Sequence, residues 1–425
     1  MELSVPHIVR LAKQHEIDAL TRLASKAQLV GAIGELIHSL QSERGASSIY
    51  LASAGQRFAE ARSALTATAQ TAEHALRERL QAQLETAAFG SPKLFSLMAW
   101  AFLGLEALPD LRRQIDGRKL SAYQAVAAFS RLIAGLIALL FELADSAVHP
   151  SVSRLLVAYF NFVQGKEFAG QERAVGALCY ASGVCDGAHQ QRVLHLIDAQ
   201  ERNFQVFLEF APALAAGRWS ALQTTPCVAQ LERLRRVLTV ARPGSALDSN
   251  DSDRWFDCCS ERLSDMWSLQ CALVDALQRQ CVDLIAEAQR EQQSSEGLLQ
   301  ALREHPPAGT GLVDRIFDPR APLGEAIAFA QAASTGERAA SVVEMLQMQS
   351  EKLARMESEL EQARRALNER KVIERAKGVL MARLRLSEEE AYKTLRKTAM
   401  DQNRRLIDVA ESALSLLDML APPKS

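Results

Sequence analysis

The sequence predicts an all-α protein, and three features of its composition support this. Ala, Leu, Gln, Glu and Arg dominate the chain, and these residues favour helices over sheets. Aromatic residues make up only 6%, and runs rich in Val, Ile, Thr and Tyr are nearly absent. A hydrophobic fraction of 48% is enough to fill a core. At 425 residues, the chain has room for two or three domains.

Residues 1–292 have the pattern of long amphipathic helices separated by helix breakers. Breaks are expected at Gly90–Pro92, His149–Pro150, Pro212 and Pro243–Gly244. Long helices between such breaks are typical of helical hairpins that pack into bundles. We therefore expect one N-terminal body made of helical bundles.

The composition changes after residue 292. Residues 293–336 form a connector that contains two clusters of Pro and Gly, at His305–Gly311 and Asp318–Gly324. Residues 337–366 then carry apolar side chains at alternating spacings of three and four, with a single polar seam position at Gln349. This pattern predicts a coiled coil, and with it a homodimer. The alternative is a single helix that packs on its own N-terminal body.

Charge is distributed unevenly along the chain. The formal net charge is -2, yet Leu367–Arg405 holds eleven Lys and Arg against six Asp and Glu. A basic end on an acidic body favours a polyanionic partner at that end alone.

Several classes of protein are disfavoured. The motifs H-E-x-x-H, Walker A, G-x-S-x-G and the Rossmann glycine fingerprint do not occur, so we expect neither an enzyme nor catalytic residues. Seven cysteines without a C-x-x-C pair predict structural thiols in a reducing cytosol and no metal site. The apolar runs at Phe95–Leu105 and Leu132–Phe141 fall short of the roughly 20 residues that span a bilayer. Met1–His15 lacks the apolar region of a secretory signal, so we expect a cytoplasmic protein without a membrane partner.

The C-terminal segment, 367–421, has an unusual Lys-Gly pair. Lys377 lies one helical turn from both Ile373 and Leu380, and so on or beside the inner face of its helix. Gly378 follows, although Gly inside a helix costs about 1 kcal/mol relative to Ala. A missing side chain beside a cation would let a nucleic-acid backbone approach closely. A Lys whose head reaches solvent beside a tolerated Gly is the simpler alternative.

The segment resembles the ANTAR domain. The resemblance rests on A-K-G-x-L-M at Ala376–Met381 and on the spacing of Ser387, Tyr392, Leu395 and Ala399. It implies a three-helix end on a coiled coil that binds RNA with paired stem-loops and prevents transcription termination. DNA binding, and a solvated role for single arginines, remain alternatives. The RNA contacts that it implies are Ala376, Lys377, Gly378, Arg396 and Arg405.

Two further motifs place an arginine among apolar or small residues. In Gln41–Ser47, Arg44 shares a helix face with apolar neighbours, and in Lys166–Ala174, Arg173 lies among small residues. A buried arginine needs an anion, because an unpaired buried charge is very costly. An internal salt bridge to Glu43 or Glu172 would supply one. The alternative is a shared flat oxyanion, which suits the guanidinium fork.

These motifs, Q-x-E-R-G-x-S and K-E-x-A-G-Q-E-R-A, together with Trp255-Phe256, resemble the NIT domain, a nitrate- and nitrite-sensing helical module. The resemblance implies two four-helix bundles in residues 1–292, with the anion held between them by arginines. Arg44 and Arg173 match its motifs, and we choose Arg236 as a third ligand, with Arg233 and Arg235 as alternatives.

The predicted order is a NIT domain (1–292), the connector (293–336), the coiled coil (337–366) and an ANTAR domain (367–421). It implies a regulator in which nitrate or nitrite controls the binding of stem-loops in leader RNA, acting indirectly on RNA polymerase. No cofactor is expected besides this ligand. A different small anion, or a partner protein, could act on the same scaffold.

Overall fold

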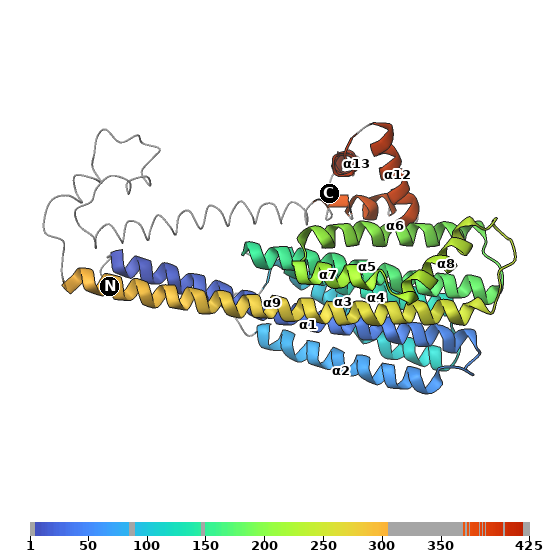
Figure 1. The fold of residues 1–425 in the computed structure, drawn as a ribbon, viewed down its shortest axis with the longest axis horizontal. Helices are drawn as coiled ribbons and strands as arrows, with labels where there is room; N and C mark the ends of the chain where they lie inside the picture. Colours follow the sequence, from blue (N-terminus) through green and yellow to red (C-terminus); the bar gives the residue numbers. More distant parts are fainter. Residues whose placement is uncertain are drawn as a thin grey trace, which may run out of the picture.

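The computed structural model describes residues 5–84, 90–145, 149–304 and, apart from seven positions, 369–419. These residues are helical except for short connections and an isolated bridge between Val184 and Ala246. The helices form an elongated body with a small C-terminal group against one side (Figure 1). In the body they are α1 (Val5–Ala52), α2 (Ala59–Leu84), α3 (Pro92–Asp116), α4 (Ala122–Asp145), α5 (Pro150–Ser182), α6 (Gly187–Phe210), α7 (Ala213–Leu222), α8 (Pro226–Val240) and α9 (Asp251–Glu304).

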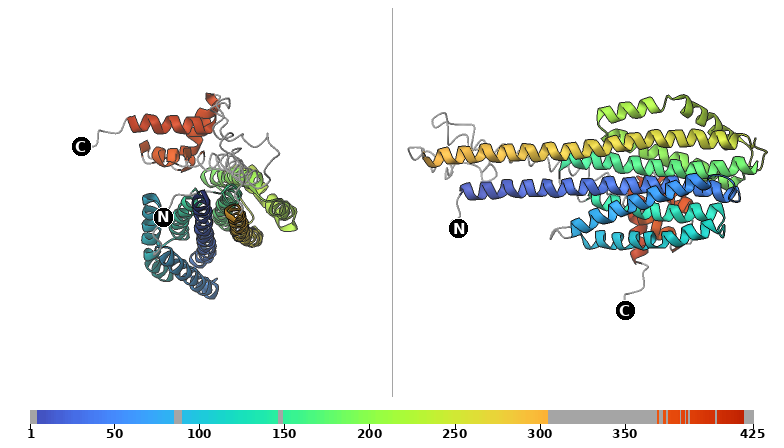
Figure 2. Two further views of the ribbon diagram at one scale, coloured as in Figure 1. Left: turned by 90° about the vertical axis from the view of Figure 1, so that its left-hand side faces the viewer. Right: turned by 90° about the horizontal axis from the view of Figure 1, so that it is seen from below.

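The body consists of two bundles, as the resemblance to the NIT domain implies. In the first, α1 packs against α2 and α4, and α3 packs against α4. In the second, α5 packs against α6 and α9, and α8 packs against α6 and α9. The long helices α1 and α9 lie side by side and join the two bundles (Figure 2). Helix α5 also contacts α1 and α4, so it is buried on most of its surface.

The four breaks that the sequence predicts all fall at the junctions between helices, and the body has further breaks at 53–58, 117–121 and 183–186 that the sequence does not predict. Helix α3 begins at Pro92, and the hydroxyl of Ser91 accepts a hydrogen bond from the Leu94 amide at 3.1 Å. Such a cap satisfies one of the free amides at a helix start. Helix α5 begins at Pro150, where the missing amide hydrogen costs nothing. Pro212 precedes α7, and the Pro243–Gly244 turn lies between α8 and α9.

The end of the body differs from the prediction. Helix α9 continues to Glu304, so the first part of the 293–336 connector extends this helix. The rest of the connector and the coiled coil predicted for 337–366 lie outside the described residues.

The C-terminal group contains α12 (Glu388–Asp401), α13 (Leu406–Met419) and a preceding helical segment at 375–381. Its core is small, as the sequence pattern predicts, and it is not continuous with the core of the body. The buried residues of this core are Ala376, Leu380, Ala391, Leu395, Ala399, Val409 and Ala410.

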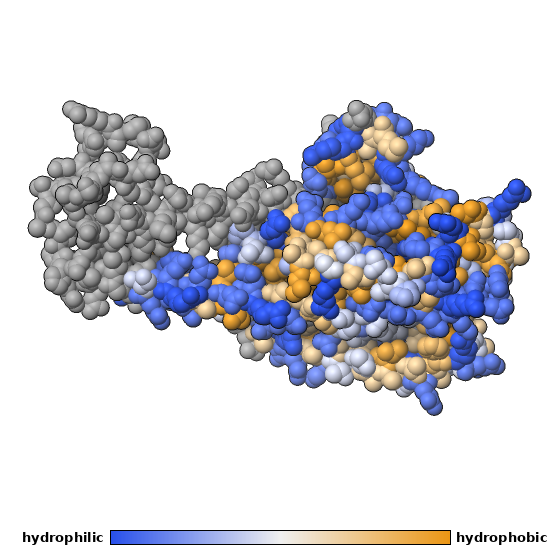
Figure 3. Space-filling model, in the orientation of Figure 1, coloured by the Kyte–Doolittle hydropathy of each residue, from blue (hydrophilic) through white to orange (hydrophobic). Residues whose placement is uncertain are grey.

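Two helices, α3 and the Ala122–Leu143 part of α4, are long and apolar enough to cross a membrane. Length and composition alone are weak evidence for this, because core helices of soluble proteins pass the same test. Half of the apolar window in α4 is buried, and Phe129 and Ile133 lie in the core of the first bundle. On the face shown in Figure 3, hydrophilic and hydrophobic residues are interspersed.

Candidate functional site

Arg44 lies on α1, with its guanidinium between the two bundles and only 1% of its surface exposed. Its Nη1 donates to Oε1 of Glu167 on α5 at 2.5 Å, and its Nη2 donates to Oε2 at 3.2 Å. Nη1 also donates to the hydroxyl of Ser130 on α4 at 2.8 Å. Arg44 therefore has an internal counter-ion. This counter-ion is Glu167, and not Glu43 or Glu172, which the sequence suggests as partners.

Arg173 lies on α5 and is also buried, with 8% of its surface exposed. Its Nη1 donates to the Ser260 hydroxyl at 3.0 Å, its Nη2 donates to the Gln41 carbonyl at 3.5 Å, and its guanidinium lies 4.9 Å from the Phe256 ring centroid. None of these partners is charged, and Arg173 forms no ion pair with any residue that the structure describes. Burial, followed by the charge of Arg44, lowers the pKa of Arg173 to about 10. The side chain is thus a buried cation at neutral pH.

Glycines of the two motifs bring these arginines together. A Cβ atom at Gly45 on α1 would overlap the guanidinium of Arg173, and one at Gly170 on α5 would overlap that of Arg44. Each arginine therefore lies over a glycine of the opposite helix. This confirms that small residues in the motifs allow close helix packing around the arginines.

The glutamates of the motifs pair with other arginines. Glu43 accepts two hydrogen bonds from Arg112 on α3, each of 2.8 Å. Glu172 accepts two from Arg235 on α8, each of 2.6 Å. These pairs point away from the Arg44–Arg173 pair, so they leave Arg173 without a carboxylate.

The structure does not bring Arg236 to this pair. Arg236 and Arg233 are exposed on α8, whereas Arg235 is buried on the face that also carries Leu231 and Leu238. Of the three arginines considered for a third ligand, only Arg235 faces the interior. The inward-facing arginine is already neutralised by Glu172, which lowers its availability for a ligand.

A buried amine, that of Lys166, lies next to Glu167, and the sequence does not predict it. Lys166 is 1% exposed, and its Nζ lies 3.1 Å from Nδ1 of His38, 3.0 Å from Oε1 of Gln270 and 4.8 Å from the Trp267 ring centroid. Burial lowers the pKa of Lys166 to about 7. Burial and the charge of Lys166 lower the pKa of His38 to about 3, so the imidazole is neutral. Its place as the first residue of the second motif was the only sequence signal for Lys166.

The residues predicted to contact RNA lie in different environments. Ala376 is fully buried in the C-terminal core, so it supports packing rather than a surface contact. Lys377 is 6% exposed, which confirms that it lies on the inner face. A Cβ atom at Gly378 would meet nothing within 4 Å, so packing does not require this glycine. Arg396 and Arg405 are exposed, and each lies close to a carboxylate, that of Asp198 and that of Glu369 respectively.

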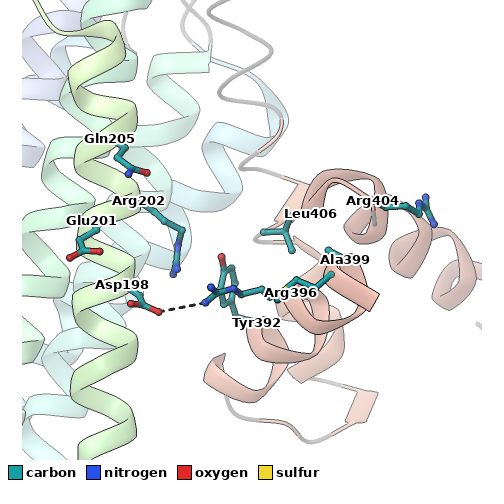
Figure 4. A pocket seen from close by; sticks show the side chains of 10 residues that line it. Asp198, Glu201, Arg202, Gln205, Tyr392, Arg396, Ala399, Arg404 and Leu406 are labelled. Carbon is teal, nitrogen blue, oxygen red and sulfur yellow. Dashed lines mark ion pairs between the residues drawn. The ribbon is translucent and has the colours of Figure 1, made fainter. Parts of the chain in front are cut away.

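One of these residues contacts the body directly. Arg396 on α12 lies 3.6 Å from the Asp198 carboxylate on α6, and the guanidinium of Arg202 on α6 lies 4.5 Å from the Tyr392 ring centroid (Figure 4). Lys393 also donates to the Gln191 side chain at 3.2 Å. A cavity of about 490 Å³ lies between the two groups of helices. The C-terminal group is therefore held against α6 by polar contacts around a hollow.

The cysteines and the acidic residues that the structure describes form no metal centre. All seven cysteines are free thiols. Within the ranges that the structure describes, no cluster of His, Cys, Asp or Glu could hold a metal ion. Burial raises the pKa of the Cys259 thiol, which makes this thiol a poor nucleophile at neutral pH.

Comparison with known proteins agrees with both resemblances. The family described as nitrate and nitrite sensing (NIT) matches residues 35–278, and the ANTAR domain matches residues 361–413. The nitrate regulatory protein of Klebsiella oxytoca is 34% identical over 415 residues, which are 96% of this chain and 93% of that protein. The solved structure of the NasR transcription antiterminator is 29% identical, with a TM-score of 0.59, and the match covers 97% of this chain and 99% of that one. This chain therefore belongs to the NIT family of nitrate- and nitrite-sensing proteins and ends in an ANTAR domain.

Proposed function

We propose that nitrate or nitrite binds between Arg44 and Arg173 and thereby controls the binding of leader-RNA stem-loops by the ANTAR domain. Holding these stem-loops prevents termination upstream of nitrate-assimilation genes. The observation that carries the proposal is Arg173, a buried guanidinium without a carboxylate partner.

The charges around this pair favour one monovalent anion. Arg44 and Arg173 contribute two positive charges, and Glu167 contributes one negative charge. One nitrate or nitrite would neutralise the remainder. A planar oxyanion also matches the fork of guanidinium donors, and burial strengthens each such bond relative to water.

The position of the site suggests how binding reaches the output. Arg44 is on α1 of the first bundle and Arg173 is on α5 of the second, so an anion between them favours one arrangement of the bundles. Helix α6 packs on α5 and contacts Arg396, a residue implied to bind RNA. We infer that the contact with Asp198 competes with RNA for Arg396, and that the anion disfavours the arrangement in which this contact forms. The anion can shift the balance only by binding the two arrangements with different affinity.

The protein acts in the cytoplasm as a regulator rather than an enzyme and needs no cofactor besides the anion. The coiled coil of 337–366 joins two chains in a homodimer. RNA polymerase responds indirectly, through the folding of the leader. Exposed arginines on α12 and after it would bind phosphates, so RNA affinity should fall as salt rises.

The alternative is a different small anion, or a partner protein, on the same scaffold. Calorimetry with nitrate, nitrite, chlorate and acetate separates these possibilities. We expect nitrate or nitrite to bind more tightly than acetate, because acetate would place an apolar methyl group, which accepts no hydrogen bond, between the two guanidinium groups. Tighter binding of acetate, or no binding of any of these anions, would contradict nitrate sensing.

A further inference from the structure

A second cavity lies inside the first bundle, on the side of α1 that faces away from Arg44. Its volume is about 260 Å³, somewhat below the roughly 300–1,000 Å³ of pockets that hold drug-sized molecules. A ligand of this site is therefore small. The residues that line it come from α1, α2 and α3: Tyr50, Ala59, Arg62, Ser63, Thr66, Arg112 and Asp116.

Arg62 is the central observation. It is 7% exposed, and its guanidinium lies 5.0 Å from the Tyr50 ring centroid. Its Nη2 is paired with the carboxylate of Asp116. Its Nη1 is buried and has no hydrogen-bond partner among the described residues. A buried donor without an acceptor costs about 1–3 kcal/mol, so a ligand that supplies an acceptor would be stabilised here.

Arg112, the second arginine of the cavity, is already neutralised by Glu43, so an incoming anion would pair with Arg62. Arg112 donates from Nε and Nη2 to Glu43, and the hydroxyl of Thr66 donates to the same carboxylate at 2.9 Å. Glu43 therefore accepts three hydrogen bonds, and its charge is balanced by Arg112. Arg112 also lines the cavity, and its Nη1 takes no part in the pair with Glu43.

Asp116 is an exchangeable partner for Arg62. Its side chain is 60% exposed, and it is the last residue of α3. A negative charge at the C-terminal end of a helix is unfavourable, because the helix dipole places partial negative charge there. An incoming anion can displace this carboxylate to solvent, and the anion then meets Nη1 and Nη2 of Arg62 together.

We propose that this cavity binds a small oxyanion, a phosphate or a small carboxylate, through Arg62 with support from Arg112. The site is distinct from the Arg44–Arg173 pair. Glu43 and Arg44 are neighbours on α1, but Glu43 faces Arg112 on α3 and Arg44 faces Glu167 on α5.

Calorimetry of the full-length protein with phosphate, acetate and succinate tests the proposal. We expect one of these anions to bind the wild type, and the preferred anion identifies the ligand class. Binding should weaken at least tenfold in Arg62→Gln. Ala59→Phe, which fills the cavity and leaves the charges in place, should have the same effect. Arg113→Gln is the matched control, because its side chain is 77% exposed and lies next to Arg112 in the sequence.

Arg173→Met separates this site from the nitrate site. It should keep the phosphate or carboxylate binding while it loses nitrate binding. Circular dichroism confirms that each variant is folded. The proposal is overturned if none of the three anions binds, if both Arg62→Gln and Ala59→Phe bind like the wild type, or if Arg173→Met abolishes the binding.

Discussion

Arg44 and Arg173 belong to similar motifs, yet their removal should change the stability of the nitrate-free protein by very different amounts. Arg44→Gln leaves Glu167 buried without its cation, and breaking a buried ion pair costs about 3–5 kcal/mol. Gln41 and Gln171 still donate to this carboxylate, at 2.8 and 2.9 Å. We therefore expect the lower end of that range, a loss of about 3 kcal/mol in the free energy of unfolding.

Arg173→Met removes a cation that has no counter-ion. Its pKa falls from 12.5 to about 10, and at about 1.4 kcal/mol per pKa unit the folded state disfavours this charge by about 3–4 kcal/mol. The variant also loses the hydrogen bonds to Ser260 and Gln41 and the contact with Phe256, each worth about 1 kcal/mol. These effects nearly cancel, so the stability should change by about 1 kcal/mol or less.

Urea denaturation followed by tryptophan fluorescence measures this difference. All four tryptophans lie in the described helices of the body, so the signal reports the sensor and not the ANTAR domain: Trp100, Trp219, Trp255 and Trp267. Nitrate at 100 times its dissociation constant should stabilise the wild type by about 2.7 kcal/mol, and neither variant should respond. Arg236→Gln, an exposed control, should behave like the wild type. If Arg173→Met loses as much stability as Arg44→Gln without nitrate, Arg173 is a structural residue and our reasoning fails.

Three further predictions follow from other contacts. Burial lowers the pKa of Lys166 to about 7, so between pH 7 and about 10 the unfolded chain binds more protons than the folded protein, and the free energy of unfolding should rise with pH. Lys166→Met should remove this rise in urea titrations at about pH 7, 8.5 and 10. The same rise in the variant would contradict the lowered pKa of Lys166. Asp198→Asn should strengthen RNA binding in the absence of nitrate by up to about fivefold in anisotropy assays. The variant loses the half-exposed ion pair with Arg396, and such a pair is worth up to about 1 kcal/mol. Weaker RNA binding by the variant would contradict the inference that this ion pair competes with RNA. Gly176→Ala should lower the free energy of unfolding by about 1–3 kcal/mol, because the added Cβ overlaps Trp255. Gly217→Ala, with open space around it, should raise the free energy of unfolding by up to about 1 kcal/mol. Equal effects of the two variants in urea denaturation would contradict the close packing of Gly176 against Trp255.

The sequence was sufficient to predict much of the fold, because local signals determine helix ends. Breaks at Pro92 and Pro150 follow from proline and capping chemistry, which needs no tertiary information. The register of α8 was also accessible. Arg235, and not Arg236, lies four residues after the buried Leu231, so the spacing of apolar residues in α8 indicates that Arg235 is the inward-facing arginine.

Other features of the site depend on tertiary packing and could not be predicted. The direction in which Glu172 points, toward Arg235 instead of Arg173, depends on where α8 lies relative to α5. The environment of Lys166 combines residues from α1, α5 and α9, which are far apart in the chain. The contact of Asp198 with the ANTAR domain joins two exposed residues, and neither has a distinctive sequence pattern.

The central claim is that an anion at Arg173 controls the RNA-binding end of the chain. The most direct test is an anisotropy titration of a stem-loop leader RNA, taken from a nitrate-assimilation operon of the same genome, with and without saturating nitrate. We predict that nitrate strengthens RNA binding by the wild type about tenfold and leaves binding by Arg173→Met unchanged. Identical wild-type curves with and without nitrate, or an equal nitrate response in Arg173→Met, would contradict the account.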